Sequence, residues 1–120
     1  MLVLIVDDNE KNLRLARDTL QLKGARTVEA ATGESALSLA ATQLPDVILM
    51  DIRLPDMSGV DALRRLKEDP ATATIPVVAL TAFAMDGDRT WLLAQGFDGY
   101  LAKPIDVRTF PDEVRSFCAG

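Results

Sequence analysis

Acidic, basic and hydroxyl side chains follow four short apolar runs in this chain of 120 residues. They are Asp7 and Asp8 after residues 2–6, Asp51 after residues 47–50, Thr81 after residues 75–80, and Lys103 after residues 100–102. Three carboxylates brought together would repel one another, at about 4 kcal/mol for a pair about 4 Å apart and an effective dielectric of about 20. A hard divalent cation such as Mg²⁺ would offset that repulsion. A carboxylate beside Mg²⁺, a lysine and a hydroxyl can attack phosphorus and form an acyl phosphate.

The apolar runs alternate with longer amphipathic stretches, which predicts five βα units. We expect strands at residues 2–6, 26–30, 47–50, 75–80 and 100–102, and helices at residues 9–23, 33–43, 59–68, 85–95 and 106–118. Buried strands that alternate with helices form a parallel sheet with helices on both faces. Pro111 fits a first helical turn better than a helix interior, with Thr109 as the N-cap. Sites in such sheets lie at the carboxyl ends of the strands, so the polar residues should meet at one edge.

The composition excludes several other kinds of chemistry. With 48% hydrophobic and 26% charged residues, the chain has a globular balance that predicts one domain over residues 1–120. It contains no histidine, which excludes histidine-dependent hydrolysis, histidine zinc sites and a histidine phosphoacceptor. Its one cysteine, Cys118, cannot form an internal disulfide. The net charge of −5 argues against direct DNA binding, and no apolar run is long enough for a signal peptide or membrane span, which predicts a cytoplasmic location.

Four motifs give the chain a family resemblance. They are L-I-V-D-D-N at 4–9, L-M-D-I-R-L-P-D-M-S-G at 49–59, A-L-T-A at 79–82 and G-Y-L-A-K-P at 99–104. In this order and at this spacing they resemble the response-regulator receiver domain of the CheY-like superfamily, and the T-A-F-A-M run at 81–85 is similar to stand-alone cell-cycle receivers. The resemblance implies a flavodoxin-like (βα)5 fold, a doubly wound five-stranded parallel sheet in the order 2-1-3-4-5. It also implies that a histidine kinase or a histidine phosphotransfer protein donates phosphate.

The resemblance assigns the acceptor and the metal ligands. Asp51 is the implied phosphoacceptor, and Mg²⁺ would be held by Asp7, Asp8, Asp51 and the backbone carbonyl of Arg53. Such a chain would catalyse only its own phosphotransfer and dephosphorylation. Taken singly, the acids have structural alternatives: the Asp7-Asp8 pair could be a solvated turn or a helix N-cap, which Asn9 could equally provide, and Asp51 could be a turn former.

The resemblance also assigns the residues that respond to phosphate. Thr81 and Lys103 would contact the phosphoryl group, Thr81 and Tyr100 would form a switch pair, and the peptide before Pro104 would be cis. Alone, Thr81 could be a strand-end residue, Tyr100 a core aromatic and Lys103 a solvated side chain. The agreement of four strand ends favours the functional interpretation.

Three side chains near these positions could modify the site. Arg53 and Phe83 each lie two residues past a site residue, and the resemblance implies that they flank the route of water to the acyl phosphate. Alternatively, Arg53 is solvated and Phe83 packs on a helix. In the helix at 85–95 we expect Leu93 to face the sheet, in phase with Phe97, and Trp91 to face outward as part of a partner surface. The alternative for Trp91 is a satellite of the core.

Two other classes of protein fit part of the pattern. Haloacid-dehalogenase hydrolases also use an aspartate nucleophile, Mg²⁺ and a lysine, but they carry D-x-D after the first strand and a cap domain. Here the two acids are adjacent, and 120 residues leave no length for a cap. A pseudo-receiver would lack some of the acids, the threonine or the lysine, and all are present. We therefore expect a phosphorylation-controlled switch that acts through an unidentified downstream protein or a phosphorylation-dependent dimer.

Overall fold

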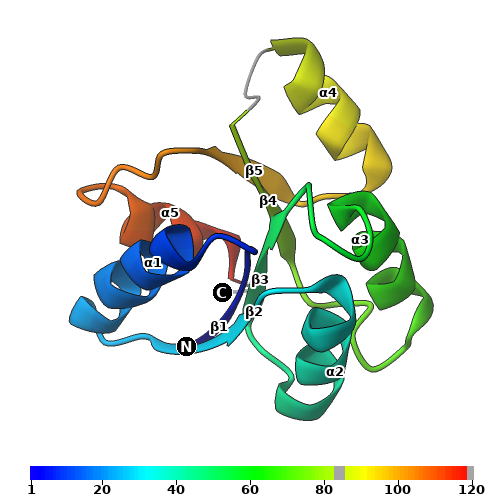
Figure 1. The fold of residues 1–120 in the computed structure, drawn as a ribbon, viewed down its shortest axis with the longest axis horizontal. Coiled ribbons are helices and arrows are strands. Elements are labelled where there is room, and N and C mark those ends of the chain that lie inside the picture. Colours follow the sequence, from blue (N-terminus) through cyan, green and yellow to red (C-terminus); the bar gives the residue numbers. More distant parts are fainter. Residues whose placement is uncertain (83–85, 119–120) are drawn as a thin grey trace.

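Strands and helices alternate along the chain in the computed structural model, which describes residues 1–82 and 86–118, with the backbone alone at 86–88. The strands are β1 (Leu2–Val6), β2 (Arg26–Ala30), β3 (Val47–Asp51), β4 (Val77–Thr81) and β5 (Gly99–Ala102). The helices are α1 (Glu10–Leu22), α2 (Gly33–Gln43), α3 (Gly59–Glu68), α4 (Asp86–Gln95) and α5 (Phe110–Phe117) (Figure 1). The alternation of strands and helices along the described residues agrees with the sequence-based prediction.

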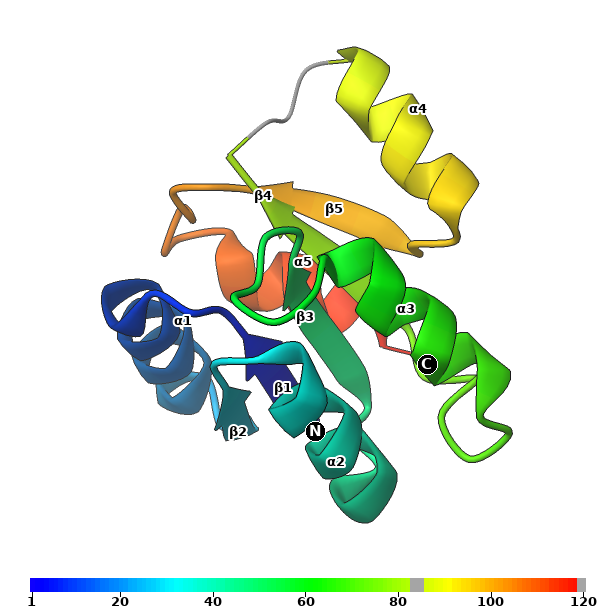
Figure 2. The same cartoon turned by 45° about the vertical axis from the view of Figure 1, so that its right-hand side comes forward.

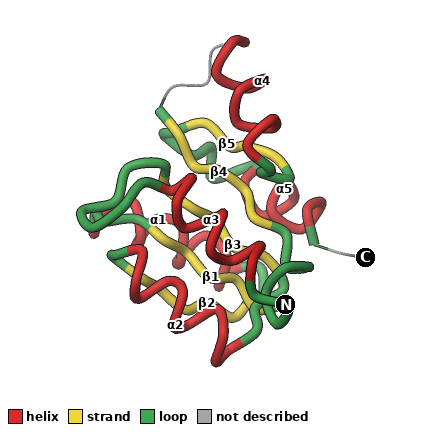
Figure 3. Tube along the Cα trace, turned by 90° about the vertical axis from the view of Figure 1, so that its right-hand side faces the viewer, coloured by secondary structure: helices red, strands yellow, loops and turns green. Residues whose placement is uncertain are grey.

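The five strands form one parallel sheet in the order β2-β1-β3-β4-β5. Helices α1 and α5 cover one face, and α2 and α3 cover the other (Figures 1 and 2). Helix α4 stands at one end of the molecule beside the edge strand β5 (Figure 3). This is the predicted doubly wound (βα)5 fold with the predicted strand order.

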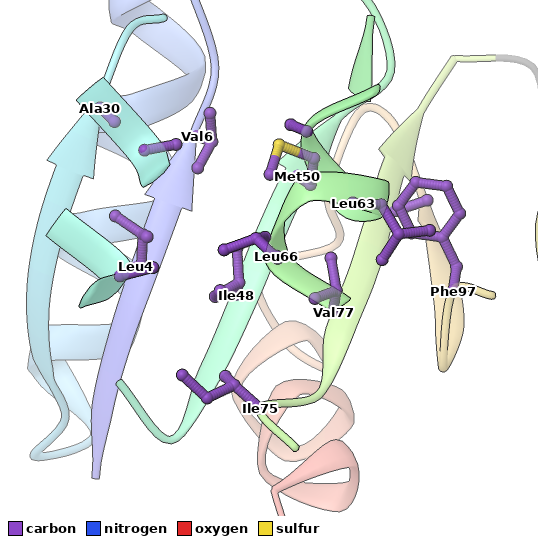
Figure 4. Close-up of a cluster of buried hydrophobic side chains, with 14 of the residues drawn as sticks. Leu4, Val6, Ala30, Ile48, Met50, Leu63, Leu66, Ile75, Val77 and Phe97 are labelled. Atoms are coloured by element: carbon purple, nitrogen blue, oxygen red, sulfur yellow. The ribbon is translucent and has the colours of Figure 1, made fainter. Parts of the chain in front are cut away.

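Two hydrophobic clusters lie on the two faces of the sheet. Along β1, Leu4 and Val6 point into the cluster beneath α2 and α3, whereas Val3 and Ile5 point into the cluster beneath α1 and α5. Figure 4 shows the first cluster, where side chains of the central strands meet those of α3. Successive strand residues point to opposite faces, so a strand covered on both sides must be apolar throughout. This explains the continuous apolar runs in the sequence.

Helix starts and ends differ from the prediction where local hydrogen bonds intervene. Asn9, not Asp7 or Asp8, caps α1, and its side chain accepts the N–H of Asn12 at 3.1 Å. Helix α5 begins at Phe110 rather than at residue 106, because residues 106–109 form a turn. Thr109 is the N-cap residue of α5, as predicted, but it makes no side-chain capping bond.

Strand β4 begins at Val77, two residues later than predicted. Pro76 has no N–H to donate to a neighbouring strand, so it lies just before the first residue of β4 and not within the strand. The Pro76 carbonyl accepts the N–H of Ile48 at 2.9 Å, and the N–H of Val77 donates to Asp98 Oδ2 at 2.8 Å.

None of the helices in residues 1–82 and 86–118 combines the length and apolar content needed to span a bilayer.

Candidate functional site

The carboxyl ends of four strands meet at one open depression. It is lined by residues that follow or end β1, β3, β4 and β5, among them Asp7, Asp8, Asp51, Thr81 and Lys103. The parallel register places these strand ends at the same edge of the sheet. The structure therefore brings together the five residues that the sequence analysis selected for phosphate chemistry.

The three aspartates form a compact acidic cluster. One carboxylate oxygen from each of Asp7, Asp8 and Asp51 lies within 4.8 Å of the other two. Asp8 is exposed, whereas Asp7 is only 1% exposed and Asp51 is largely buried. The cluster thus reaches from the interior to the surface, as a site that admits a small ligand must.

The two buried carboxylates are oriented in the same way. Asp7 Oδ1 accepts the N–H of Asn9 at 2.9 Å, and Asp51 Oδ1 accepts the N–H of Arg53 at 3.1 Å. In each case the partner lies two residues further along the chain, the arrangement of an Asx-turn. Each turn holds one carboxylate oxygen, and the other, Oδ2, lies beside Lys103.

Lys103 supplies positive charge between these two oxygens. Its Nζ lies 2.8 Å from Asp7 Oδ2 and 3.0 Å from Asp51 Oδ2, and it donates a hydrogen bond to the latter. Asp7 Oδ2 is buried and, among the described residues, accepts no directional hydrogen bond despite the close ammonium. Three carboxylates against one ammonium leave two negative charges in excess. A divalent cation with oxygen ligands fits both the charge and the donor atoms.

Burial and charge together shift two pKa values in the depression. Burial raises the pKa of Asp51, and the hydrogen bonds from the Arg53 N–H and from Lys103 offset this only in part. Burial acts to lower the pKa of Lys103, but the contacts with Asp7 and Asp51 outweigh it, so the pKa of Lys103 is raised. The lysine therefore stays an ammonium, while the chain alone compensates the Asp51 charge incompletely.

Glycine and proline positions fix the backbone around Asp51 and Lys103. A Cβ atom at Gly59 would collide with the Asp51 carbonyl, and the Gly59 N–H donates to the Ile52 carbonyl at 2.7 Å. A glycine at position 59 therefore lets the chain after the loop approach the Asp51 backbone closely. The Lys103–Pro104 peptide is cis, as the family resemblance implied.

The two residues assigned to the switch lie on neighbouring strands. Ala79 of β4 pairs with Tyr100 of β5, and Thr81 pairs with Ala102. Because side chains alternate between faces, Thr81 and Tyr100 lie on the same face as diagonal neighbours. Thr81 is buried, and the half-buried ring of Tyr100 lies 5.4 Å below the guanidinium carbon of Arg89 of α4.

The residues expected beside the site have different outcomes. Arg53 is exposed and lines the depression. Phe83 lies outside the described residues, so its flanking role stays a prediction. Trp91 is 49% exposed, as expected for an outward-facing side chain.

The expectation for Leu93 was wrong. Leu93 is 44% exposed, and among residues 89–95 of α4 it is Leu92, at 2% exposed, that packs into the core. The predicted phase assumed helical spacing from Leu93 to Phe97. Gly96 adopts a positive φ of 111° and ends the helix, so Phe97 does not continue that spacing.

Comparison with known proteins defines the class. The family model of the response regulator receiver domain matches residues 3–115, so the chain belongs to this family, and the hydrolase alternative falls away. The chain is therefore a receiver domain of two-component signalling. Members of this family are signalling switches, and a phosphoacceptor role fits the family. Receiver domains interact with histidine kinases or phosphotransfer proteins.

Individual relatives make the similarity more specific. The chain is 44% identical over 115 residues to the polar-differentiation response regulator DivK of Brucella ovis, covering 96% of this chain and 94% of the relative. It superposes with a TM-score of 0.91 on a putative response regulator from Chloroflexus aurantiacus, at 30% identity over 99% of this chain and 98% of that one. The receiver domain of the Pseudomonas aeruginosa sensor histidine kinase PA1611, with Mg²⁺ coordinated in its active-site cleft, superposes at 0.87 and 34% identity over 97% and 95% of the two chains.

Proposed function

We propose that this protein is a phosphorylation-controlled switch in which Asp51 accepts phosphate from a phosphohistidine. The observation that carries the proposal is the charge arrangement in the depression. Asp7 and Asp51 are buried together and share the ammonium of Lys103, and Asp8 adds a third carboxylate within 4.8 Å of both. The donor would be a histidine kinase or a histidine phosphotransfer protein.

The metal proposal concerns Asp7, Asp8, Asp51 and the backbone carbonyl of Arg53. All four groups offer oxygen atoms, the ligands that Mg²⁺ prefers. When bound, Mg²⁺ would neutralise charge that develops on the phosphoryl oxygens. The exposed Asp8 would face the side from which metal and donor arrive.

The transfer would use the Asp51 oxygen that lies beside Lys103. Oδ1 is held by the Arg53 N–H, so Oδ2, on the side of Lys103, is the proposed nucleophile. As the oxygen–phosphorus bond forms, the phosphorus–nitrogen bond to the donor histidine breaks. Lys103 then pairs with a phosphoryl oxygen, and the Thr81 hydroxyl donates to another. Hydrolysis of this acyl phosphate by the chain itself would release inorganic phosphate and reset the switch, with Arg53 and Phe83 flanking the route of water.

The proposed output leads from Thr81 to the α4 end of the molecule. Phosphorylation adds about −1.5 to −2 charge at the acceptor, and movement of Thr81 toward it frees space beside the diagonal neighbour Tyr100. The Tyr100 ring lies against the guanidinium of Arg89, so a rotation of Tyr100 would alter the packing of α4. We place the exposed Trp91 in the surface that a downstream protein or a second copy of the chain recognises. A cytoplasmic location, without DNA or membrane binding, completes the proposal.

Labelling with a small phosphodonor tests the proposal. Phosphoramidate with Mg²⁺ should add one phosphoryl group to the wild-type chain, and EDTA should prevent it. Asp51→Asn should abolish labelling, whereas Asp61→Asn, the same change at an exposed position of α3, should not. Labelling of Asp51→Asn at the wild-type rate would refute the assignment of the acceptor.

A further inference from the structure

The loop between β3 and α3 carries the Arg53 carbonyl, and its base is held close to the acceptor. The Arg53 N–H donates to Asp51 Oδ1 at 3.1 Å, and the Gly59 N–H donates to the Ile52 carbonyl at 2.7 Å. Arg53 and Ser58 also form an antiparallel bridge across the loop. These bonds fix the two ends of the loop but not its tip.

The tip is held by a different element, through Asp56. Asp56 Oδ1 accepts the N–H of Gly33 at 2.7 Å, and Oδ2 accepts the N–H of Glu34 at 3.0 Å. Gly33 and Glu34 are the first two residues of α2, whose N–H groups have no partner within the helix. The hydrogen bonds from Glu34 and Gly33 lower the pKa of Asp56, so the carboxylate is ionised at the positive end of the helix.

Thr32 completes the start of α2 in another way. Its hydroxyl oxygen accepts the N–H of Ser35 at 3.1 Å, and its carbonyl accepts the N–H of Ala36 at 3.1 Å. The N–H groups of the first four helical residues, 33–36, therefore all have partners. Thr32 caps α2 from the adjoining segment, whereas Asp56 ties α2 to the loop that follows the acceptor.

Two further contacts connect this tie to the acidic cluster. A Cβ atom at Gly33 would overlap the Met57 side chain, so the loop tip lies directly against the start of α2. The Ala30 carbonyl, just before α2, accepts the N–H of Asp7 at 3.0 Å. The segment from Ala30 to Glu34 therefore contacts Asp7 at one end and, through Asp56, the loop after the acceptor at the other.

We propose that Asp56 is a positioning residue for the metal and acceptor site. Its carboxylate would contact neither the metal nor the phosphoryl group. Its two hydrogen bonds hold the loop at the place where the Arg53 carbonyl can join the carboxylates of Asp7, Asp8 and Asp51. The inference rests on the proposed function, because it needs Mg²⁺ at those groups. Without these two hydrogen bonds all the metal ligands remain, but the Arg53 carbonyl is less well placed, so Mg²⁺ binds more weakly.

Titration calorimetry with Mg²⁺ alone tests the inference. Asp56→Ala should raise the Mg²⁺ dissociation constant about threefold to tenfold, less than the roughly 10–100-fold cost of losing a group bonded directly to a metal ligand. The matched control is Thr32→Ala, which weakens the same helix end without touching the loop. It should lower the melting temperature yet leave the dissociation constant within about twofold of wild type. Phosphorylation of Asp56→Ala by phosphoramidate should be slow at limiting Mg²⁺ and recover at saturating Mg²⁺.

Each other outcome overturns a defined part of the account. An unchanged dissociation constant in Asp56→Ala, or an equal rise in Thr32→Ala, would overturn the positioning role alone. Wild-type protein that binds no Mg²⁺ would overturn the proposed site and the inference with it. If Asp56→Ala does not fold, Asp56→Asn, which keeps one acceptor oxygen, serves in its place and should give a smaller rise of the same sign.

Discussion

The acceptor edge and helix α4 are built in opposite ways, although they lie beside the same sheet. At the acceptor edge the buried carboxylates are held by backbone N–H groups, and α3 beside it buries Ala62, Leu63 and Leu66. In α4, among residues 89–95, whose side chains are described, only Leu92 is buried. Figures 1 and 3 show α4 at the periphery of the packed layers.

This difference suits the two tasks of a switch. A group that transfers phosphate needs fixed neighbours, because small displacements reduce the rate strongly. An element that changes shape on phosphorylation must be able to move at low free-energy cost, which means few buried apolar contacts. Four changes test the contrast between the two regions.

The largest effect should come from the core of α3. Leu66 is 2% exposed, so Leu66→Ala removes buried methyl groups and leaves a cavity. We expect the free energy of unfolding to fall by about 2–5 kcal/mol. Urea denaturation measures this loss, and a loss below about 1 kcal/mol would contradict a rigidly packed α3.

Mg²⁺ should stabilise the fold by binding at the acceptor edge. Because only the folded chain assembles the three carboxylates, Mg²⁺ at about 100 times its dissociation constant should add about 2.7 kcal/mol to the free energy of unfolding. Thermal melts in Mg²⁺ and in EDTA measure the gain, which Asp8→Ala should lose. Equal melting temperatures of the wild type in the two buffers would contradict an assembled site.

The pH dependence of stability should report the burial of Asp51. Burial raises the folded-state pKa of Asp51 above its unfolded value of about 3.9, so the ionised group destabilises the metal-free fold. The penalty is full above the folded pKa and disappears as the pH falls toward the unfolded value. In EDTA, Asp51→Asn should therefore melt higher than wild type at pH 7, with the gain shrinking in acid. A gain that does not change with pH would contradict this explanation.

The smallest effect should come from the outer side of α4. Trp91 is half exposed, so Trp91→Ala should change the free energy of unfolding by no more than about 0.5 kcal/mol. Fluorescence of this single tryptophan should respond to phosphorylation in the wild type, and Trp91→Ala should weaken partner binding or self-association while Asp51 is still phosphorylated. A tryptophan emission that does not change on phosphorylation would contradict the proposal that α4 responds to the phosphorylation of Asp51.

The same contrast explains how much the sequence could predict. Buried strands must be apolar on both faces, so the sheet and the strand-end positions of Asp7 and Asp51 followed from short-range patterns. The orientation of Leu93 could not be predicted in this way, because Gly96 ends the helix before Phe97 and interrupts the helical spacing between Leu93 and Phe97. Asp56 was also missed as a tie between elements, since its partners lie 23 and 22 residues away in sequence and are backbone N–H groups, which no residue type reveals.

The proposed switch depends on phosphorylation of the Asp51 carboxylate, which can be located directly. Borohydride reduces an aspartyl phosphate to homoserine and so marks the phosphorylated position permanently. Peptide mapping by mass spectrometry after phosphoramidate, Mg²⁺ and borohydride should find homoserine at position 51, and none when EDTA replaces Mg²⁺. Homoserine at position 7 or 8 instead, or an unmarked chain that carries phosphate elsewhere, would contradict the account.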